Sequence, residues 1–276
     1  RDTVPGMDRL APLRVFPRLA VWGSLVKFSH SIFALPFALS MVLVASRGRP
    51  ITGDRIFRIL VALVAARTSA MAFNRVIDRE FDRQNPRTAM REIPSGVVSV
   101  SEGWVLVVLS AGCFVLASGM LGTHCLLLSV PVLAVLLGYS LAKRFTSLAH
   151  LVLGVALACA PGGVWYALTA TFSWVPIPMM AGVLLWVAGF DIVYACQDVE
   201  FDRSAGLYSV PARLGVGGAL RVARILHLFA AACLVLFGAV AELGTLYYVG
   251  VGCFSSAMFS QHLLVSSDDL SRVDLA

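Results

Sequence analysis

Long runs of apolar residues dominate this sequence, and short polar segments separate them. A helix needs about 20 apolar residues to cross the hydrocarbon core of a bilayer. Because backbone polar groups in lipid must be satisfied within their own segment, each such run is expected to be a helix. The alternating ten-residue pattern of a β-barrel is not found. The sequence therefore predicts an all-α integral membrane protein with eight spans, at 19–46, 56–77, 97–118, 121–142, 148–170, 174–195, 219–241 and 243–265.

The composition agrees with a membrane location. Of the 276 residues, 58% are hydrophobic and 14% are charged, whereas soluble proteins carry about 25% charged residues. The net charge of +6 suits the phosphates of a membrane or of a nucleic acid; the apolar content selects the membrane, so no nucleic-acid partner is expected. The six cysteines form no CxxC pair, which argues against a zinc site or a disulfide framework. The histidines at 124, 150, 227 and 262 lack ligand spacing and are expected to be structural or interfacial.

Lysine and arginine residues outside the spans set the predicted orientation. Most of them fall before the first span, between spans two and three, and between spans six and seven, which all lie on one side of the membrane. By the positive-inside rule this side, with the N-terminus, is cytoplasmic. The exception is the loop between spans one and two, which places four arginines on the opposite side: Arg47, Arg49, Arg55 and Arg58.

Acidic residues concentrate on the predicted cytoplasmic side. The segments 78–97 and 197–218, together with the adjoining Asp191, hold half of the 16 acidic residues. Within them IDREFDR (77–83) and QDVEFDR (197–203) share five of seven positions at an offset of 120 residues. Four spans separate the two motifs, so both emerge on the same side with the same helix direction. This duplication indicates two related halves, a common design in membrane proteins.

The spacing of the acidic residues predicts metal binding. Two aspartates at i and i+4 on one helix face repel each other unless a cation lies between them. Carboxylate oxygens suit Mg²⁺, which commonly bridges carboxylates to substrate phosphates. The alternative is a pair of solvated loops in which the aspartates pair with neighbouring Arg79, Arg83 and Arg203. The residues sharing a face are Asn74, Asp78 and Asp82 after span two, and Asp191, Asp198 and Asp202 at the end of span six, with Tyr194 beside them.

Three charged residues, Asp191, Arg67 and Lys27, lie inside predicted spans. A charge in lipid is costly, so each is expected to face the bundle interior with a partner. Lys27 can instead reach the interface by snorkelling. Four further cations lie close to the acidic segments, where they either bind phosphate or serve as anchors or a lid: Lys143, Arg144, Arg87 and Arg91.

These motifs resemble those of the UbiA superfamily of intramembrane prenyltransferases. NxxxDxxxD ends one helix at residues 74–82, and YxxxDxxxD follows four helices later at 194–202. The flanking segments VKFSHSIFALPFAL (26–39), YSLAKRFT (139–146) and residues 190–215 are most similar to bacterial 4-hydroxybenzoate polyprenyltransferases, including the branch associated with menaquinone synthesis. The resemblance implies a ring of nine helices around a lipid-open cavity in the bacterial inner membrane. One domain over 1–276 is expected, lacking the last of those helices.

The resemblance also implies a reaction and a set of roles. The family transfers a polyprenyl group from its diphosphate to an aromatic acceptor with Mg²⁺. Here 4-hydroxybenzoate is the expected acceptor, with dihydroxynaphthoate, haem and homogentisate as alternatives. Asp78, Asp82, Asp198 and Asp202 would hold Mg²⁺; Arg67, Lys143, Arg144, Tyr194, Lys27, Arg87 and Arg91 would bind substrate; Asp191 and Asn74 would orient the acceptor, and Asp191 would help to activate its hydroxyl.

Two other classes of membrane protein fit less well. A CDP-alcohol phosphotransferase carries its aspartates in one continuous stretch that begins with DxxDG, which this chain lacks. A transporter with inverted repeats places its intramembrane charges near the midplane. Here the repeats are parallel and both acidic motifs cap one side, so transport is the weaker hypothesis.

Overall fold

The computed structural model describes residues 15–27, 35–48, 50–266, 270 and 273, and the secondary structure in these ranges is helical, without a strand. The all-α expectation is confirmed. The elements are α1 (Val15–Leu25), α2 (Leu35–Ala45), α3 (Gly53–Ile77), α4 (Arg79–Gln84), α5 (Val100–Leu121), α6 (Thr123–Ala142), α7 (Ala149–Thr169), α8 (Ile177–Ala195), the 3₁₀ helix η2 (Cys196–Asp198), α9 (Val199–Ser204), α10 (Val210–Val240) and α11 (Thr245–Leu264).

Six helical segments of the described chain are long and apolar enough to cross a membrane, which makes the protein a multi-pass membrane protein. They comprise α3, α5, α6, α7, α8 with its continuation to Ser204, and α10. The described residues therefore do not confirm the predicted number of eight. The last predicted span is α11, whose 20 residues include several serines and the polar pair Gln261–His262. The first predicted span is not a single helix.

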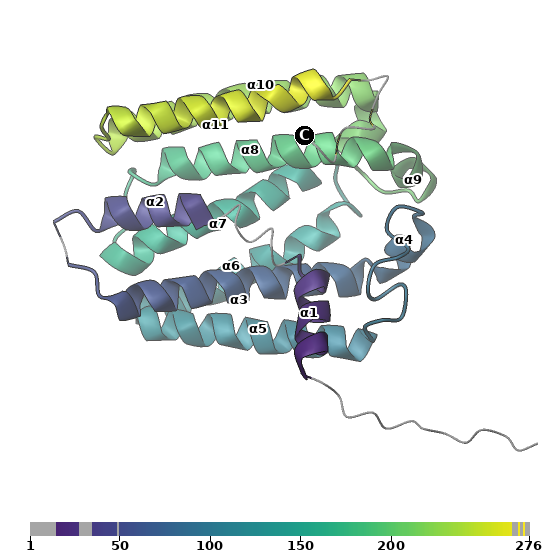
Figure 1. The fold of residues 1–276 in the computed structure, drawn as a ribbon, viewed down its shortest axis with the longest axis horizontal. Helices are drawn as coiled ribbons and strands as arrows, with labels where there is room; N and C mark the ends of the chain where they lie inside the picture. The colour runs from purple at the N-terminus through teal and green to yellow at the C-terminus, as the bar shows by residue number, and fades with distance from the viewer. Residues whose placement is uncertain (1–14, 28–34, 49, 267–269, 271–272, 274–276) are drawn as a thin grey trace, which may run out of the picture.

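The apolar run 19–46 divides into two short helices, α1 and α2, of 11 residues each. Residues 28–34 between them lie outside the described residues. Lys27 follows α1 in a turn with a positive φ of 48°, so it is not inside a spanning helix as predicted. Pro36 occupies the first turn of α2, where a helix tolerates proline. Figure 1 shows α1 lying across the direction of α3 and α5.

The second acidic segment, predicted to extend to residue 218, ends earlier because α10 begins at Val210. The Ser209 hydroxyl accepts a hydrogen bond from the Ala212 backbone N–H at 3.2 Å, and Pro211 stands in the first turn, so both helix-start signals are present. Gly215, with a φ of 70°, then kinks the helix. The helix-start signals at Ser209 and Pro211 were present in the sequence but lay in a charged stretch.

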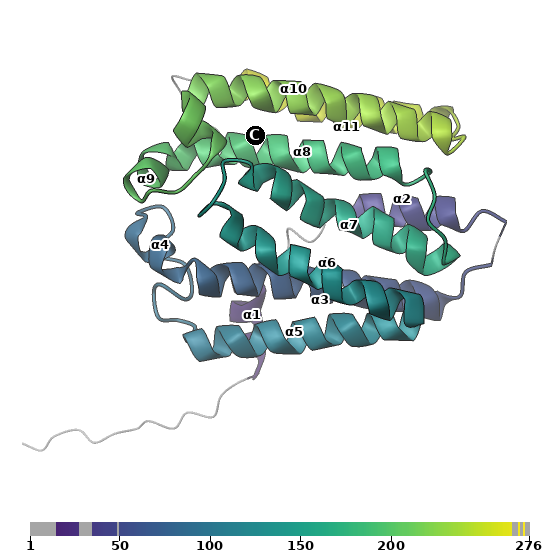
Figure 2. The ribbon, with the colours of Figure 1, turned by 180° about the vertical axis from the view of Figure 1, so that it is seen from behind.

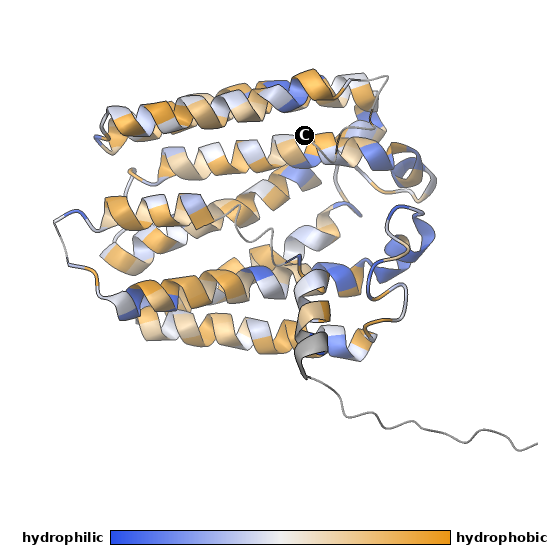
Figure 3. Ribbon diagram, in the orientation of Figure 1, coloured by the Kyte–Doolittle hydropathy of each residue, from blue (hydrophilic) through white to orange (hydrophobic). Residues whose placement is uncertain are grey.

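The long helices run along a common direction, with α10 and α11 at one edge and α3 and α5 at the other (Figure 1). Polar residues gather at one end of this bundle, around α4 and α9, while the helices are mostly apolar along their length (Figure 3). The same two short helices are neighbours in the reverse view (Figure 2). The bundle therefore brings together the two acidic segments, which are 120 residues apart.

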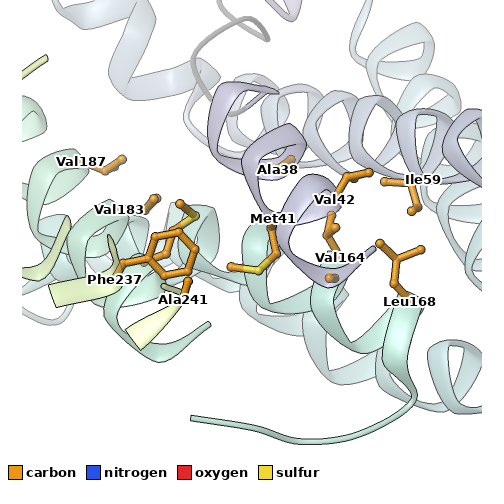
Figure 4. Close-up of a cluster of buried hydrophobic side chains, with 12 residues drawn as sticks. Ala38, Met41, Val42, Ile59, Val164, Leu168, Val183, Val187, Phe237 and Ala241 are labelled. Carbon is orange, nitrogen blue, oxygen red and sulfur yellow. The ribbon is translucent and has the colours of Figure 1, made fainter. Parts of the chain in front are cut away.

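A hydrophobic cluster joins α2, α7, α8 and α10 around Met41 and Phe237, both fully buried (Figure 4). Small residues allow the helices to approach closely, as is usual inside membranes. A Cβ at Gly154 would collide with the Leu184 backbone carbonyl, and one at Gly189 would collide with the His227 ring. These two contacts fix α8 between α7 and α10, and α8 leads directly into the second acidic motif.

Three of the four arginines that contradict the charge rule have a structural role at the end of the bundle opposite α4 and α9, and Arg49 lies outside the described residues. Arg55 Nη2 donates to the Ala167 carbonyl at 2.8 Å. Arg58 Nη1 donates to the Met120 carbonyl at 2.6 Å, and Arg47 donates to a carbonyl at the end of α10. Each acceptor belongs to the last turn or cap of a helix, where carbonyls lack intrahelical partners and the helix dipole favours cations.

We expect Arg55→Ala to destabilise the protein, because it leaves a carbonyl at the end of α7 without its charged donor. The expected loss is about 1.5 kcal/mol of unfolding free energy, measured by unfolding in mixed detergent and SDS micelles. Arg83→Ala is the control: its side chain is 65% exposed, and such surface ion pairs contribute little. Equal stability of the two variants would contradict the capping role.

Candidate active site

The two acidic motifs occupy equivalent breaks between helices. Asp78 ends α3 and precedes α4, while Asp198 lies in η2 between α8 and α9. The i to i+4 backbone hydrogen bonds continue across the first break, from Asp78 to Asn74 and from Asp82 to Asp78. The predicted common face of Asn74, Asp78 and Asp82 is therefore kept although the helix is interrupted.

Arginines from outside the first motif pair with both of its aspartates. Asn74 donates its amide N–H to Asp78 Oδ2 at 2.7 Å, and Arg144 donates to Asp78 Oδ1 at 3.1 Å. Burial raises the pKa of the Asp78 carboxyl above its ordinary value, although the Arg144 hydrogen bond opposes this. Asp82 is buried and pairs with Arg91 at 2.6 Å. Both carboxylates thus have a cationic partner.

The second motif is tied to the first by residues of the segment after α4. Asp198 accepts hydrogen bonds from the Asn85 amide and from Arg87 Nε, both at 2.9 Å, and from Arg87 Nη2 at 2.5 Å. The third Arg87 nitrogen, Nη1, donates to the Tyr194 hydroxyl at 3.0 Å, and the guanidinium lies 4.9 Å from the Tyr194 ring centroid. This two-pronged pairing of arginine with a carboxylate is strong and directional. It joins the two halves of the chain.

Lys143 is a further cation close to both motifs. It caps the C-terminus of α6, and its carbonyl accepts a hydrogen bond from the Tyr208 backbone N–H at 2.8 Å. The Lys143 charge acts on four carboxylates, those of Asp78, Asp191, Asp198 and Asp202. Lys143, Arg144, Arg87 and Arg91 therefore all lie at the acidic end of the bundle, as predicted.

The acidic donor set has the chemistry of a divalent-metal site. In the described part of the chain, no three acidic, histidine or cysteine side chains gather as a ready metal site. Asp82 Oδ2 and Asp202 Oδ2 are nevertheless buried and have no hydrogen-bond partner. Unpaired buried carboxylate oxygens are costly, and hard oxygen donors suit Mg²⁺. The four motif aspartates can thus supply ligands from both halves.

A largely apolar cavity of about 480 Å³ lies inside the bundle and extends from the level of Arg67 and Tyr139 to the end opposite α4 and α9. Its walls come mainly from α3, α5, α6 and α7, and include the aromatic residues Phe114, Trp165 and Tyr166. Arg67 and Tyr139 also line the cavity, and the Tyr139 hydroxyl interacts electrostatically with Asp78 and Asp191. Arg67 faces the bundle interior as predicted, and its Nε is buried without a hydrogen-bond partner.

Known proteins identify the family. Residues 34–275 match the model of the UbiA prenyltransferase family. The chain belongs to this family. The 4-hydroxybenzoate octaprenyltransferase of Paracidovorax citrulli is 33% identical over 72% of this chain and 68% of its own length. The protein of the same name from Methylococcus capsulatus is 30% identical over 95% and 90%.

Solved structures agree with the UbiA-family fold. A UbiA homolog from Aeropyrum pernix K1 superposes with a TM-score of 0.83 at 34% identity, over 89% of this chain and 91% of that one. A UbiA homolog from Archaeoglobus fulgidus bound to DMAPP and Mg²⁺ has a TM-score of 0.68 at 18% identity, over 88% and 84%. The predicted family, fold class and prenyltransferase activity are thus confirmed.

Four residues of this UbiA-family chain differ from the sequence prediction or were absent from it. Lys27 is exposed in its turn, and no hydrogen bond or ion pair joins it to the aspartates in the described structure. His150, expected to be structural, bonds Asp191 at 2.6 Å. Asn85 and Tyr139 were not singled out. Only Asn85 had a signal, since it lies within the charged segment that follows α4.

We expect Arg87→Ala to destabilise the metal-free UbiA-family protein by about 2 kcal/mol, because Asp198 then keeps a largely buried charge without its partner. The double variant Arg87→Ala/Asp198→Asn should lose less than the sum of the two single losses, since it removes the charge as well. Unfolding in mixed micelles measures both quantities. Additive losses would contradict the direct pairing of the two side chains.

Proposed function

We propose that this protein transfers a polyprenyl group from a prenyl diphosphate to an aromatic acceptor, with 4-hydroxybenzoate as the first candidate. The main observation in support of this proposal is that two acidic motifs and four cations converge at one end of a bundle that also encloses an apolar cavity. Relatives named 4-hydroxybenzoate octaprenyltransferase support this acceptor. Dihydroxynaphthoate, haem and homogentisate are the alternatives.

Asp78, Asp82, Asp198 and Asp202 would hold Mg²⁺ against the diphosphate. Support comes from the unpartnered buried oxygens of Asp82 and Asp202 and from the Archaeoglobus fulgidus homologs bound to Mg²⁺ with DMAPP or GPP. When bound, the metal neutralises the charge that develops on the leaving diphosphate.

The arginines of the site have two uses in this proposal. Without substrate, Arg87 and Arg91 neutralise Asp198 and Asp82. With substrate bound, the same guanidinium groups donate to the diphosphate oxygens, for which their planar fork is well suited. Lys143 and Arg144, which follow the C-terminus of α6, would donate further hydrogen bonds to the diphosphate oxygens. When the C–O bond between the prenyl group and the diphosphate breaks, its electron pair therefore remains on a diphosphate surrounded by cations.

The cavity would hold the prenyl chain and exclude water from the allylic cation. Its lining is largely apolar, and the aromatic side chains of Phe114, Trp165 and Tyr166 add apolar surface on which the distal part of the chain can pack. Asp191 and Asn74 would orient the acceptor, and Asp191 would accept a hydrogen bond from its hydroxyl. The ring carbon next to this hydroxyl then forms the new C–C bond.

The proposed setting is a bacterial inner membrane with the N-terminus and both acidic motifs on the cytoplasmic side. The capping roles of Arg47, Arg55 and Arg58 support this orientation, because they give a structural reason for the charges on the other side. The prenyl group then lies among lipid-embedded helices and the diphosphate at the aqueous face.

Asp78→Ala and Asp198→Ala should each reduce transfer at least 100-fold, since each removes a carboxylate from the metal and diphosphate site. The assay incubates membranes with labelled prenyl diphosphates and a panel of aromatic acceptors, and product mass identifies the acceptor. Glu80→Ala is the matched control, because Glu80 is exposed and its partners among the described residues are its helix neighbours Arg83 and Gln84. EDTA should stop transfer and added Mg²⁺ restore it; normal turnover by either aspartate variant, or under EDTA, would overturn the proposal.

Gly163→Phe should shift the preference towards shorter prenyl diphosphates. Gly163 lines the cavity, and a Cβ built there meets nothing within 4 Å. The new phenyl ring therefore occupies part of the cavity proposed for the prenyl chain and does not force the helices apart. The measurement is kcat/KM for a series of chain lengths. Gly112→Phe on the exposed face of α5 also has open space and serves as the control, with an unchanged preference. The same preference in both variants would place the prenyl chain elsewhere.

A further inference from the structure

His150 connects a candidate catalytic carboxylate to the start of a helix. It lies in the first turn of α7 and its side chain is 1% exposed. Its Nδ1 lies 2.6 Å from Asp191 Oδ2 on α8, and its Nε2 accepts a hydrogen bond from the Val210 backbone N–H at 3.3 Å. Three helices therefore meet through one imidazole ring.

The Val210 N–H determines which ring nitrogen carries the proton. A backbone N–H only donates, so His150 Nε2 must be the unprotonated nitrogen. In the neutral ring the proton then lies on Nδ1, which donates to Asp191. Val210 is the first residue of α10, where backbone N–H groups have no intrahelical acceptor. The imidazole ring thus accepts a hydrogen bond from the otherwise unpaired Val210 N–H, and this N–H in turn fixes the tautomer of the ring.

The Asp191 carboxylate is held on one side and open on the other. Its side chain keeps 28% of its surface exposed, against 1% for His150. The charged and titratable groups that act on it are His150 from α7, Lys143 at the end of α6 and the Tyr139 hydroxyl of α6. Tyr139 also lines the cavity, so Asp191 and the cavity proposed for the prenyl chain share this neighbour.

We propose that His150 is a positioning residue, which fixes Asp191 so that its free oxygen accepts the hydroxyl proton of the aromatic acceptor; this rests on the proposed function. The C–O bond of the prenyl diphosphate breaks with its electron pair on the diphosphate. The ring carbon next to the hydroxyl bonds the allylic carbon while Asp191 takes the hydroxyl proton. The ring carbon then loses its hydrogen to solvent as a proton, and Asp191 returns its proton to the oxygen, so one proton and one diphosphate are released.

The test compares His150→Gln with His150→Leu. A glutamine amide can donate to Asp191 and accept from Val210, whereas leucine can do neither. His150→Gln should keep kcat within about 3-fold, and His150→Leu should lose about 100-fold in kcat, the size expected for a displaced catalytic group. KM for the prenyl diphosphate should stay the same in both variants, because the diphosphate cations are untouched.

A second readout separates positioning from general damage. 4-Hydroxybenzoate is compared with 3-fluoro-4-hydroxybenzoate, and dihydroxynaphthoate with its ring-fluorinated analogue, because fluorine makes the hydroxyl easier to ionise. The loss caused by His150→Leu should be smaller with the fluorinated acceptor. An equal loss with both members of a pair, or full activity of His150→Leu, overturns the assignment.

The tautomer is measured independently of activity. ¹⁵N-histidine spectra of the protein in nanodiscs, with His150→Gln to identify the signal, should show a neutral ring protonated at Nδ1. A ring protonated at Nε2, or at both nitrogens, overturns the assignment while leaving the proposed function intact. A wild-type protein that prenylates no aromatic acceptor overturns the proposed function and the role of His150 with it.

Discussion

Negative charge gathered at one end of an apolar bundle is the constraint on which the rest of this structure depends. Carboxylates that are partly removed from water need cations close by, and the chain supplies them from segments distant in sequence. The pair between Arg87 and Asp198 is the central case, because it joins the segment after α4 to η2 with a contact of 2.5 Å. This pairing links the two motifs that the helix bundle brings to the same end.

In the proposed function, the two interpretations of the aspartates, metal ligands or ion-pair partners, become two states of one site: the ion pairs are present in this structure, and the metal is proposed. The arginines found with them are not the neighbours Arg79, Arg83 and Arg203. Arg79 donates to the Val76 carbonyl and Arg203 to the Ala212 carbonyl, while Arg83 pairs with Glu80. Cations that come from other elements are free to exchange a carboxylate for a phosphate oxygen without unwinding the motif helices.

The bundle separates three environments along its length. One end carries the charged groups, the middle encloses the largely apolar cavity, and the far end has arginines that cap α5, α7 and α10. A reaction that forms a carbocation beside a diphosphate needs this order, since the anion requires cations and the carbocation requires a dry pocket. The membrane imposes part of the order, because charges are least costly near its two faces.

The sequence by itself determined the helical class, most span positions and both acidic motifs, because lipid forces backbone hydrogen bonds into helices and i, i+4 spacing places side chains on one face. Such rules describe only contacts within one or two turns of the same helix. The bond between His150 and Asp191, 41 residues apart, depends on how α7 and α8 cross, and that crossing is set by close contacts such as Gly154 against Leu184. The break of the first run near Lys27 and the partner of each aspartate were likewise decided by the tertiary structure, since packing between helices selects among contacts that the sequence permits.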